Sequence, residues 1–410
     1  MKWLGNKSIF TLLAMALVVA DAAYLMRSAL AGIVPLLFFL FVPGYLITQR
    51  WSGACVRGWV TASFAFGLSL LIMIVGGLAV NTLYFMGVAH PLNPVNLMLF
   101  LNTVTVILLW SGRQQLQRRR LPRLTVDREK AGLVAALTLL PILATLGAIR
   151  INNGGSNVLT MLAFGISAVL FILLFWRKRN VGVYPYAVFT TGLTVLLALS
   201  MRSWLVSGHD VLHEYQLFTY VLQHGFWSNS IAPGDAYEAC LSITILPTVI
   251  SAISHASGAC IFKVIMQFIF AFGLVPLYLF AKNLGGSRCA LLVALLFIAF
   301  PTFVNDMPFL VRQEVAFVFF GLVLLASFAK LRRRLATWLV MAFMIGLTLS
   351  HYSSSYVALV IFFGAWAVYF VARKFLRPTK MLHTPLLSLP ILIVAFLFTF
   401  SWNAQVTATA

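Results

Sequence analysis

Apolar segments of about 20 residues, the length that a helix needs to cross a membrane, follow one another along almost the whole chain. Short polar or basic stretches separate them. They lie near 8–26, 28–48, 58–80, 91–110, 131–149, 157–176, 182–201, 260–281, 287–304, 315–330, 335–350, 354–372 and 384–401. We therefore predict an all-α, polytopic transmembrane helical protein with about 13 spans.

A further apolar segment, 239–256, differs from the others because it contains Pro247 and many hydroxyl side chains. Its polar positions, with the turn that follows, are Ser242, Thr244, Thr248, Ser251, Ser254, His255 and Ser257. Such a composition suits a segment that packs on protein better than one that faces lipid. We predict that 239–256 is re-entrant or interfacial and does not span the membrane.

Composition supports the membrane prediction and removes other classes. The chain is 61% hydrophobic and 9% charged, whereas soluble domains carry about 25% charged residues. A solvated surface cannot be built from so few charges, so soluble, disordered and nucleic-acid-binding proteins are excluded. The net charge of +20 is then explained by cytoplasmic loops, which are rich in Lys and Arg and lie beside anionic lipid.

The distribution of basic residues predicts the orientation. With the N-terminus in the cytoplasm and 239–256 not spanning, most of the 29 Lys and Arg residues lie in cytoplasmic loops. If 239–256 spanned, the basic runs at 330–334 and 373–380 would move outside, against the positive-inside tendency. The first apolar segment resembles a signal peptide, but we expect an uncleaved anchor. We thus predict a multi-pass cell-membrane protein with the loops 202–258 and 305–314 on the extracytoplasmic side.

Acidic residues are rare and concentrated, which marks a candidate site. Of the nine in the chain, six lie in the two outer loops: Asp210, Glu214, Asp235, Glu238, Asp306 and Glu314. Asp210 and Glu214 stand four residues apart, so on a helix they share a face. The apolar side of that helix would comprise Leu212, Tyr215, Leu217, Phe218, Val221 and Leu222. The alternative is a solvated surface helix, but ionisable groups at membrane depth are usually functional.

Two histidines flank the first acid of this loop. The stretch from His209 to His213 imitates the zinc-protease pattern HExxH, with Asp210 in place of Glu. Glu214, Glu238 or His224 would have to supply a third ligand. Because so short a pattern arises easily by chance, we assign no metal ligands, and a metal-dependent membrane protease remains the weakest alternative.

Two further polar motifs are predicted on the same side of the membrane. Arg312, Gln313 and Glu314 follow Asp306, and the planar guanidinium of Arg312 suits a phosphate or diphosphate. The alternative is an ion pair of Arg312 with Glu314 or Asp306 that holds the loop. His351 and Tyr352 precede a run of serines, where the histidine would bind phosphate or relay a proton. A hydroxyl-rich turn that satisfies its own backbone is the alternative there.

These motifs together resemble the GT-C superfamily of membrane glycosyltransferases over residues 182–372. The similar parts are Gly208-His209-Asp210 with Glu214-Tyr215, the ending Gly225-Phe226-Trp227, the segment 239–256, the basic turn Leu279-Phe280-Ala281-Lys282-Asn283-Leu284-Gly285-Gly286, and Asp306-Met307-Pro308. More narrowly, GHDxxxEY, SITILP, RQE and SHYSSSY look similar to an uncharacterised multi-pass family frequent in archaea. The apolar segments predict an N-terminal bundle of six transmembrane helices over 1–180, and the resemblance implies a GT-C-like module over 181–410. The six spans of the bundle, which precede the span 182–201 that leads into the acidic loop, depart from the superfamily's usual single span.

The resemblance also implies an activity. A sugar would move from a polyprenyl phosphate or diphosphate carrier to a glycan or protein acceptor, with inversion, in the biosynthesis of cell-envelope polysaccharides. Asp210 would be the catalytic base, and Arg312 would hold the leaving phosphate. Glu214 or Asp306 would position the acceptor or a divalent cation near Asp210, while Tyr215, Gln313, Glu314, His351 and Tyr352 would line the substrate site.

Membrane lipid and a lipid-linked sugar are the expected partners, and nucleic acid is not. The alternatives are a transporter or flippase of polysaccharide precursors, in which the same residues line a path, and a non-catalytic membrane protein. A transporter predicts acids along a route through the membrane, whereas an enzyme predicts acids clustered in an outward pocket. The sugar, the carrier and the acceptor are not specified by the sequence.

Overall fold

The computed structural model describes residues 8–52, 58–120, 127–176, 181–229, 235–375 and 388–407. These residues form helices and turns and contain no strand beyond the single bridge between Ser8 and Arg120. Eleven helices in this part are long and apolar enough to cross a membrane. The all-α prediction is thus confirmed for the described residues, and the helices support a multi-pass membrane protein.

The helices follow the predicted apolar segments closely. They are α1 (Ile9–Leu25), α2 (Ile33–Ser52), α3 (Trp59–Asn81), α4 (Pro94–Ser111), α5 (Arg113–Gln117), α6 (Arg128–Asn152), α7 (Val158–Trp176), α8 (Tyr184–Ser200), α9 (Asp210–His224), α10 (Ile245–Ser254), α11 (Gly258–Cys260), α12 (Met266–Ala299), α13 (Pro301–Asn305), α14 (Val311–Phe328), α15 (Arg333–Ser350), α16 (Tyr352–Phe375) and α17 (Leu389–Thr407). Short helical turns η2 (Thr82–Met86), η3 (Val181–Val183), η4 (Ala236–Ala239), η5 (Ile261–Ile265) and η6 (Met307–Phe309) lie between them.

Capping residues fix where several helices begin. Asn93 accepts a hydrogen bond from the amide of Asn96 at 2.9 Å, and Pro94 occupies the first position of α4, where a missing amide hydrogen costs nothing. Asp127 caps α6 in the same way, through the amide of Glu129 at 3.1 Å. Both helices therefore begin at positions that the local sequence dictates.

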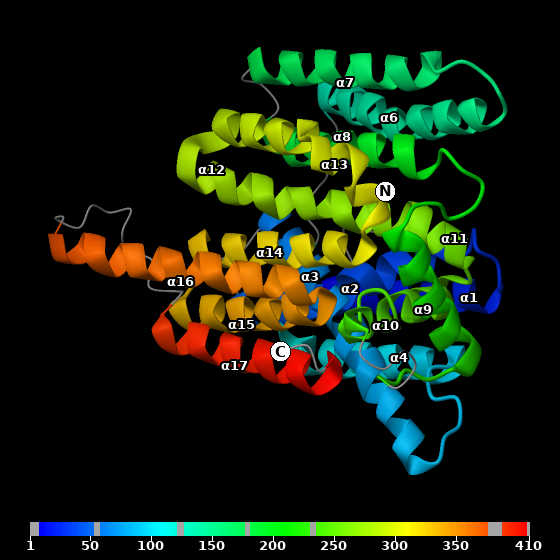
Figure 1. The fold of residues 1–410 in the computed structure, drawn as a ribbon, viewed down its shortest axis with the longest axis vertical. Coiled ribbons are helices and arrows are strands. Elements are labelled where there is room, and N and C mark those ends of the chain that lie inside the picture. Colours follow the sequence, from blue (N-terminus) through cyan, green and yellow to red (C-terminus); the bar gives the residue numbers. More distant parts are fainter. Residues whose placement is uncertain are drawn as a thin grey trace.

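Helix α12 turns back on itself at Gly286, as Figure 1 shows. Gly286 has φ 78° and ψ 177°, which lies outside the helical region and is open to glycine at little cost. The two arms of α12 correspond to the predicted segments 260–281 and 287–304. Glycine therefore makes a tight reversal between two apolar arms.

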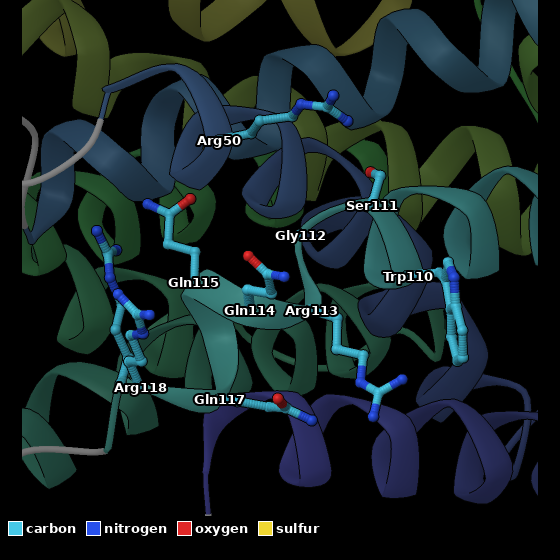
Figure 2. A pocket seen from close by; sticks show the side chains of 10 residues that line it. Arg50, Trp110, Ser111, Gly112, Arg113, Gln114, Gln115, Gln117 and Arg118 are labelled. Carbon is cyan, nitrogen blue, oxygen red and sulfur yellow. The ribbon is translucent and has the colours of Figure 1, made fainter.

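The long helices alternate in direction, so their ends gather at two opposite ends of the molecule (Figure 1). We call one the acidic end, where α9, α10 and η4 meet the starts of α14 and α16. There Leu241 donates its amide to the carbonyl of Leu349 at 2.7 Å. At the other, the basic end, Gln115 donates to the carbonyl of Gln49 at 2.9 Å. A cavity lined by arginine and glutamine lies at the basic end (Figure 2).

Helix α10 lies inside the segment predicted not to span. It has ten residues and is therefore about 15 Å long, half of a hydrocarbon core of about 30 Å. Ile245, Leu246, Ile250 and Ile253 are fully buried, and α10 packs on α2, α3, α4 and α9. The hydroxyl groups of the segment are satisfied within the protein, as in the bond from Thr248 to the carbonyl of Thr244 at 2.8 Å.

The main hydrophobic core draws on both halves of the chain, from Leu17 in α1 to Ala395 in α17. Helix α3 contacts α2 and also α10, α12, α14 and α15. The N-terminal helices therefore pack directly against the helices that carry the acidic residues. The division at residue 180 stays a prediction.

We expect Gly44→Ala to destabilise the protein by about 1–3 kcal/mol, because helices α2 and α3 pack backbone against backbone there. A Cβ on Gly44 would lie 1.9 Å from the carbonyl oxygen of Ala65. The amide of Gly44 also donates to the hydroxyl of Ser69 at 2.9 Å. Thermal unfolding of the purified protein measures the effect.

Gly165→Ala is the matched control, since Gly165 is also inside a helix but a Cβ there meets nothing within 4 Å. Alanine favours the helix over glycine by up to about 1 kcal/mol, so this variant should unfold at the same temperature or slightly higher. If Gly44→Ala and Gly165→Ala changed the unfolding temperature equally, helices α2 and α3 would not pack closely at Gly44.

Candidate functional site

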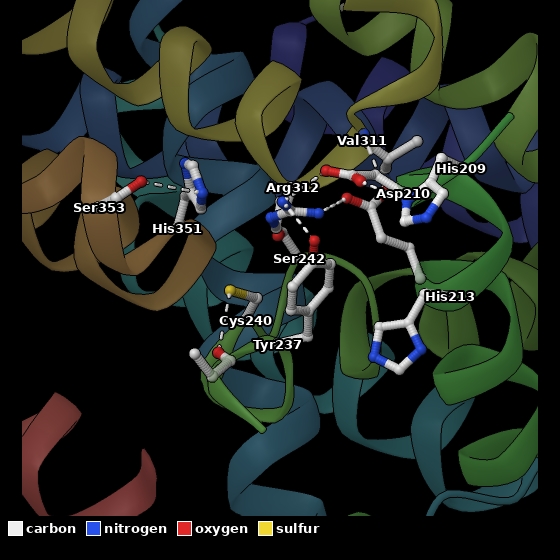
Figure 3. A network of polar contacts seen from close by, with 12 residues as sticks. His209, Asp210, His213, Tyr237, Cys240, Ser242, Val311, Arg312, His351 and Ser353 are labelled. Carbon is white, nitrogen blue, oxygen red and sulfur yellow. Dashed lines mark hydrogen bonds and ion pairs between the residues drawn. The ribbon is translucent and has the colours of Figure 1, made fainter. Parts of the chain in front are cut away.

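The side chain of Arg312, in the first turn of α14, joins helices α9 and α14 at the acidic end (Figure 3). Its Nη1 donates to Oε1 of Glu214 at 2.5 Å, and its Nη2 donates to Oδ2 of Asp210 at 2.9 Å. The two acids lie one turn apart on α9, so a single guanidinium spans both. The predicted shared face of Asp210 and Glu214 is therefore present, and it faces another helix.

Glu214 is fully buried and has two structural tasks. Besides Arg312, its Oε2 accepts the amide of Val311 at 2.9 Å, the first residue of α14. Leu310, which precedes the helix, supplies no side-chain cap. Since the first amides of a helix lack partners inside the helix and carry positive dipole charge, the carboxylate of Glu214 stabilises the start of α14. Burial raises the pKa of Glu214 to about 7, although Arg312 and the backbone amides lower it.

Asp210 is the accessible acid of the pair, with 29% of its side chain exposed. Its Oδ1 lies 3.2 Å from Nδ1 of His209. Partial burial raises the pKa of Asp210, but the hydrogen bonds from Arg312 and His209 outweigh that effect and hold the pKa below its usual value. Asp210 is therefore ionised at neutral pH, as a group that accepts a proton must be.

Tyr237 completes the surroundings of the guanidinium and was not among the predicted site residues. Its hydroxyl accepts a hydrogen bond from Nη2 of Arg312 at 2.8 Å, and its ring lies 3.7 Å from the guanidinium carbon. Stacking of this kind holds the plane of an arginine. The signal was its position between Asp235 and Glu238, two acids that the sequence had already marked.

The two histidines near Asp210 do not form a metal site with a third ligand. His209 precedes the helix and its side chain is fully exposed, whereas His213 contacts Asp235 through Nε2 at 2.5 Å. Among the residues that the structure describes, no group of three or more His, Cys, Asp or Glu side chains is placed to hold a metal ion. Asp210 and Glu214 are both held by Arg312, so we derive no step through a metal.

Arg312 pairs with neither of the partners considered from sequence. Glu314 is fully buried two residues further along α14, on a different side of the helix, where the side-chain amide of Gln267 donates to its Oε2 at 3.4 Å. Asp306 is exposed and ends α13. The expectation of a local ion pair with Glu314 or Asp306 is thus wrong. The reason is geometric, since α9 packs against the start of α14 and brings two acids from 98 and 102 residues away.

His351 lies at the same end, in the break between α15 and α16 (Figure 3). Its Nδ1 is 2.7 Å from the hydroxyl of Ser354, and its Nε2 is 3.2 Å from that of Ser353. Burial and the positive charge of Arg312 lower the pKa of His351 to about 4. The imidazole is therefore neutral at pH 7, and Ser353 and Ser354 hold it in place. This agrees with the alternative of a hydroxyl-rich turn whose polar groups bond to one another.

Three other predicted residues lie around this network without joining its hydrogen bonds. Tyr352 contacts the ring of His351 edge to face, with centroids 5.2 Å apart. Gln313 is half-buried on α14. Tyr215 packs edge to face against Phe262 at 5.3 Å, on the apolar side of α9. Their roles in binding substrate stay predictions.

The apolar side of α9 differs in part from the predicted one. Leu217, Phe218 and Val221 are buried as expected, but Leu212 is 44% and Leu222 43% exposed. Glu214 takes a buried position because Arg312 neutralises it. The buried face of α9 is therefore rotated toward Glu214 and away from Leu212 and Leu222, relative to the predicted face.

Comparisons of the chain with protein-family models, with curated proteins and with solved structures found no match.

Proposed function

We propose that the chain is an integral membrane glycosyltransferase that uses a sugar carried on a polyprenyl phosphate or diphosphate. What carries the proposal is the arrangement at Arg312, which fixes an ionised and partly exposed Asp210 at one end of the helix bundle. A carboxylate held in this way can accept a proton from an acceptor hydroxyl within hydrogen-bond reach. The GT-C-like module, the division at residue 180 and about 13 spans belong to this proposal.

The proposed reaction has one bond-forming and one bond-breaking event. The acceptor oxygen attacks the anomeric carbon of the sugar while its proton passes to Asp210. The bond from that carbon to the carrier phosphate breaks on the opposite side, so the configuration inverts and the phosphate leaves with the electron pair. Positive charge beside the leaving phosphate stabilises this step.

Arg312 is the cation nearest to Asp210 in this proposal. Because it already binds two carboxylates, it is less available to bind the leaving phosphate directly. Its Nη groups are already bound to Glu214, Asp210 and Tyr237. Its Nε is buried with no partner. We assign Arg312 to the orientation of Asp210 first, with its charge acting on phosphate at longer range. The leaving phosphate then needs further donors, for which Gln313 and Tyr352 are the candidates.

The arrangement of the acids favours an enzyme over a transporter. Asp210 and Glu214 converge on Arg312, and Glu314 lies two residues further along α14. A transport path would be supported by acids spread between the two ends of the bundle. The basic end carries exposed arginines instead, as at Arg113, Arg118 and Arg333. We propose that the basic end faces the cytoplasm and the acidic end the outside, by the positive-inside tendency.

The test is transfer of a radiolabelled sugar in sealed membrane vesicles that contain the protein. Polyprenyl phosphate and diphosphate donors with a panel of sugars are supplied, and lipid-linked sugar consumed is measured against vesicles without the protein. We expect protein-dependent transfer when the donor is supplied on the face that exposes the acidic end. Equal consumption with and without the protein across the panel would count against the proposal.

A further inference from the structure

A cavity of about 870 Å³ opens at the basic end, far from the Arg312 network. It lies where the end of α2 meets the end of α4 and the short helix α5 (Figure 2). Its lining is Arg50, Trp110, Ser111, Gly112, Arg113, Gln114, Gln115, Gln117, Arg118 and Arg119. None of these residues is acidic, and among the described residues no carboxylate forms an ion pair with Arg50, Arg113 or Arg118.

The walls of the cavity are fixed by packing on one side. Leu116 is buried and forms a small apolar cluster with Leu46 and Leu109. Gln115 is held through its bond to the carbonyl of Gln49. Helix α5 is thus anchored by one leucine and one amide, and its remaining side chains are left to line the cavity.

The chemistry of the lining suits a phosphate group. Arginine presents several N–H donors in a plane that matches phosphate oxygens, and it stays charged at any physiological pH. The glutamine amides and the hydroxyl of Ser111 add neutral donors. An electrically neutral ligand would leave the charges of Arg50, Arg113 and Arg118 without a counter-charge in the cavity.

Helix α4 indicates where such a phosphate would come from. The side of α4 that leads to the cavity carries Ile107 and Trp110, which are 61% and 66% exposed in a helix apolar enough to span a membrane. The guanidinium of Arg113 lies 4.9 Å from the centre of the Trp110 ring. Tryptophan followed by arginine at the end of an apolar helix is typical of the interface between lipid tails and head groups.

We propose that this cavity binds the phosphate of an anionic membrane lipid, with the acyl chains along the exposed apolar side of α4. Residues Arg113 and Arg118 contact the phosphate, and Trp110 lies at the level of the head group. This site is separate from the Arg312 network, so the lipid-binding proposal does not depend on the glycosyltransferase proposal.

The experiment is a native mass spectrometry titration of the purified full-length protein in detergent. Phosphatidylglycerol is the probe, and phosphatidylcholine, which has a phosphate but no net charge, is the comparison lipid. We expect the first phosphatidylglycerol to bind more tightly than phosphatidylcholine. The double variant Arg113→Gln/Arg118→Gln should lose roughly 30-fold in affinity for phosphatidylglycerol. Each basic residue near an anionic lipid contributes roughly fivefold in affinity, and the variant removes two of them.

The control is Arg332→Gln/Arg333→Gln, which removes the same charge from exposed arginines at the start of α15, outside the cavity. It should change the affinity less than about threefold, because its charges act only through the general field. If the cavity variant does not fold, Arg113→Lys/Arg118→Lys keeps the charge and should show an intermediate loss. Equal affinity of wild type and cavity variant, or an equal loss in the control, would overturn the proposal.

Inorganic diphosphate distinguishes a soluble ligand from a lipid. If diphosphate binds through Arg113 and Arg118 while the affinity for phosphatidylglycerol is the same in wild type and variant, the lipid assignment is overturned. Displacement of bound phosphatidylglycerol by excess diphosphate would support a phosphate site that lipid occupies.

Discussion

Asp210→Asn should reduce sugar transfer by about 10²–10⁴-fold, the usual contribution of a positioned general base. An amide cannot accept the proton, but its oxygen can still accept the hydrogen bond from Nη2 of Arg312, now at 2.9 Å. Glu214 keeps its own bonds to Arg312 and Val311. The variant should therefore fold, keep its unfolding temperature and bind donor lipid, so that the loss falls on the rate of transfer.

Asp127→Asn is the matched control for this substitution. Asp127 caps α6, is exposed and pairs with Lys130 at 3.1 Å, and asparagine caps helices about as well as aspartate. Transfer should be unchanged in this variant. If Asp210→Asn transferred sugar at the rate of the wild type, Asp210 would not be the base, and the proposed reaction would fail with it.

Arg312→Met should destabilise the protein by about 3–5 kcal/mol, because it leaves a buried carboxyl group without its cation. Glu214 is fully buried and would retain only backbone amides at the start of α14, among them that of Val311. Thermal unfolding in detergent, or the yield of folded protein, measures the loss. The double variant Glu214→Gln/Arg312→Met removes both charges and should recover much of the stability.

The stability of Arg312→Met should also depend on pH in a predictable direction. The pKa of Glu214 is already raised from 4.5 to about 7 by burial, against the opposing effect of Arg312. Loss of Arg312 moves the folded pKa further up, so the folded protein binds more protons than the unfolded chain. Its stability is then fully present below the unfolded pKa and is lost as the pH rises through the folded one.

We therefore expect the unfolding temperature of Arg312→Met to fall more steeply than that of the wild type between about pH 5 and 8. The double variant with Glu214→Gln should lack this additional slope. A flat profile for Arg312→Met would show that Glu214 gains water or another partner when the arginine is removed.

The helices themselves were largely predictable because lipid demands long apolar segments. Even the reversal at Gly286 fell between two predicted segments, since glycine and basic residues interrupt the apolar run there. The spacing of Asp210 and Glu214 likewise predicted a shared face. These features depend on neighbours in the sequence, and such patterns are read from the chain directly.

The partners of Arg312 were not predictable because they depend on packing between distant helices. Glu214 is polar, so the hydropathy pattern predicts a position outside the apolar core. The residue that neutralises it, Arg312, lies 98 residues later in the sequence. Tyr237 was missed for a related reason. A tyrosine among many aromatic residues carries no sign that its ring will lie under a guanidinium.

The bond between Glu214 and Arg312 has a consequence for biosynthesis. Glu214 leaves the ribosome 98 residues before the arginine that neutralises it, and an isolated carboxylate is costly in lipid. Until the start of α14 has been synthesised, helix α9 must therefore stay in water or keep Glu214 protonated. Helix α9 can dock only after α14 has been made, so in a chain truncated before residue 312 helix α9 should stay undocked and open to proteases.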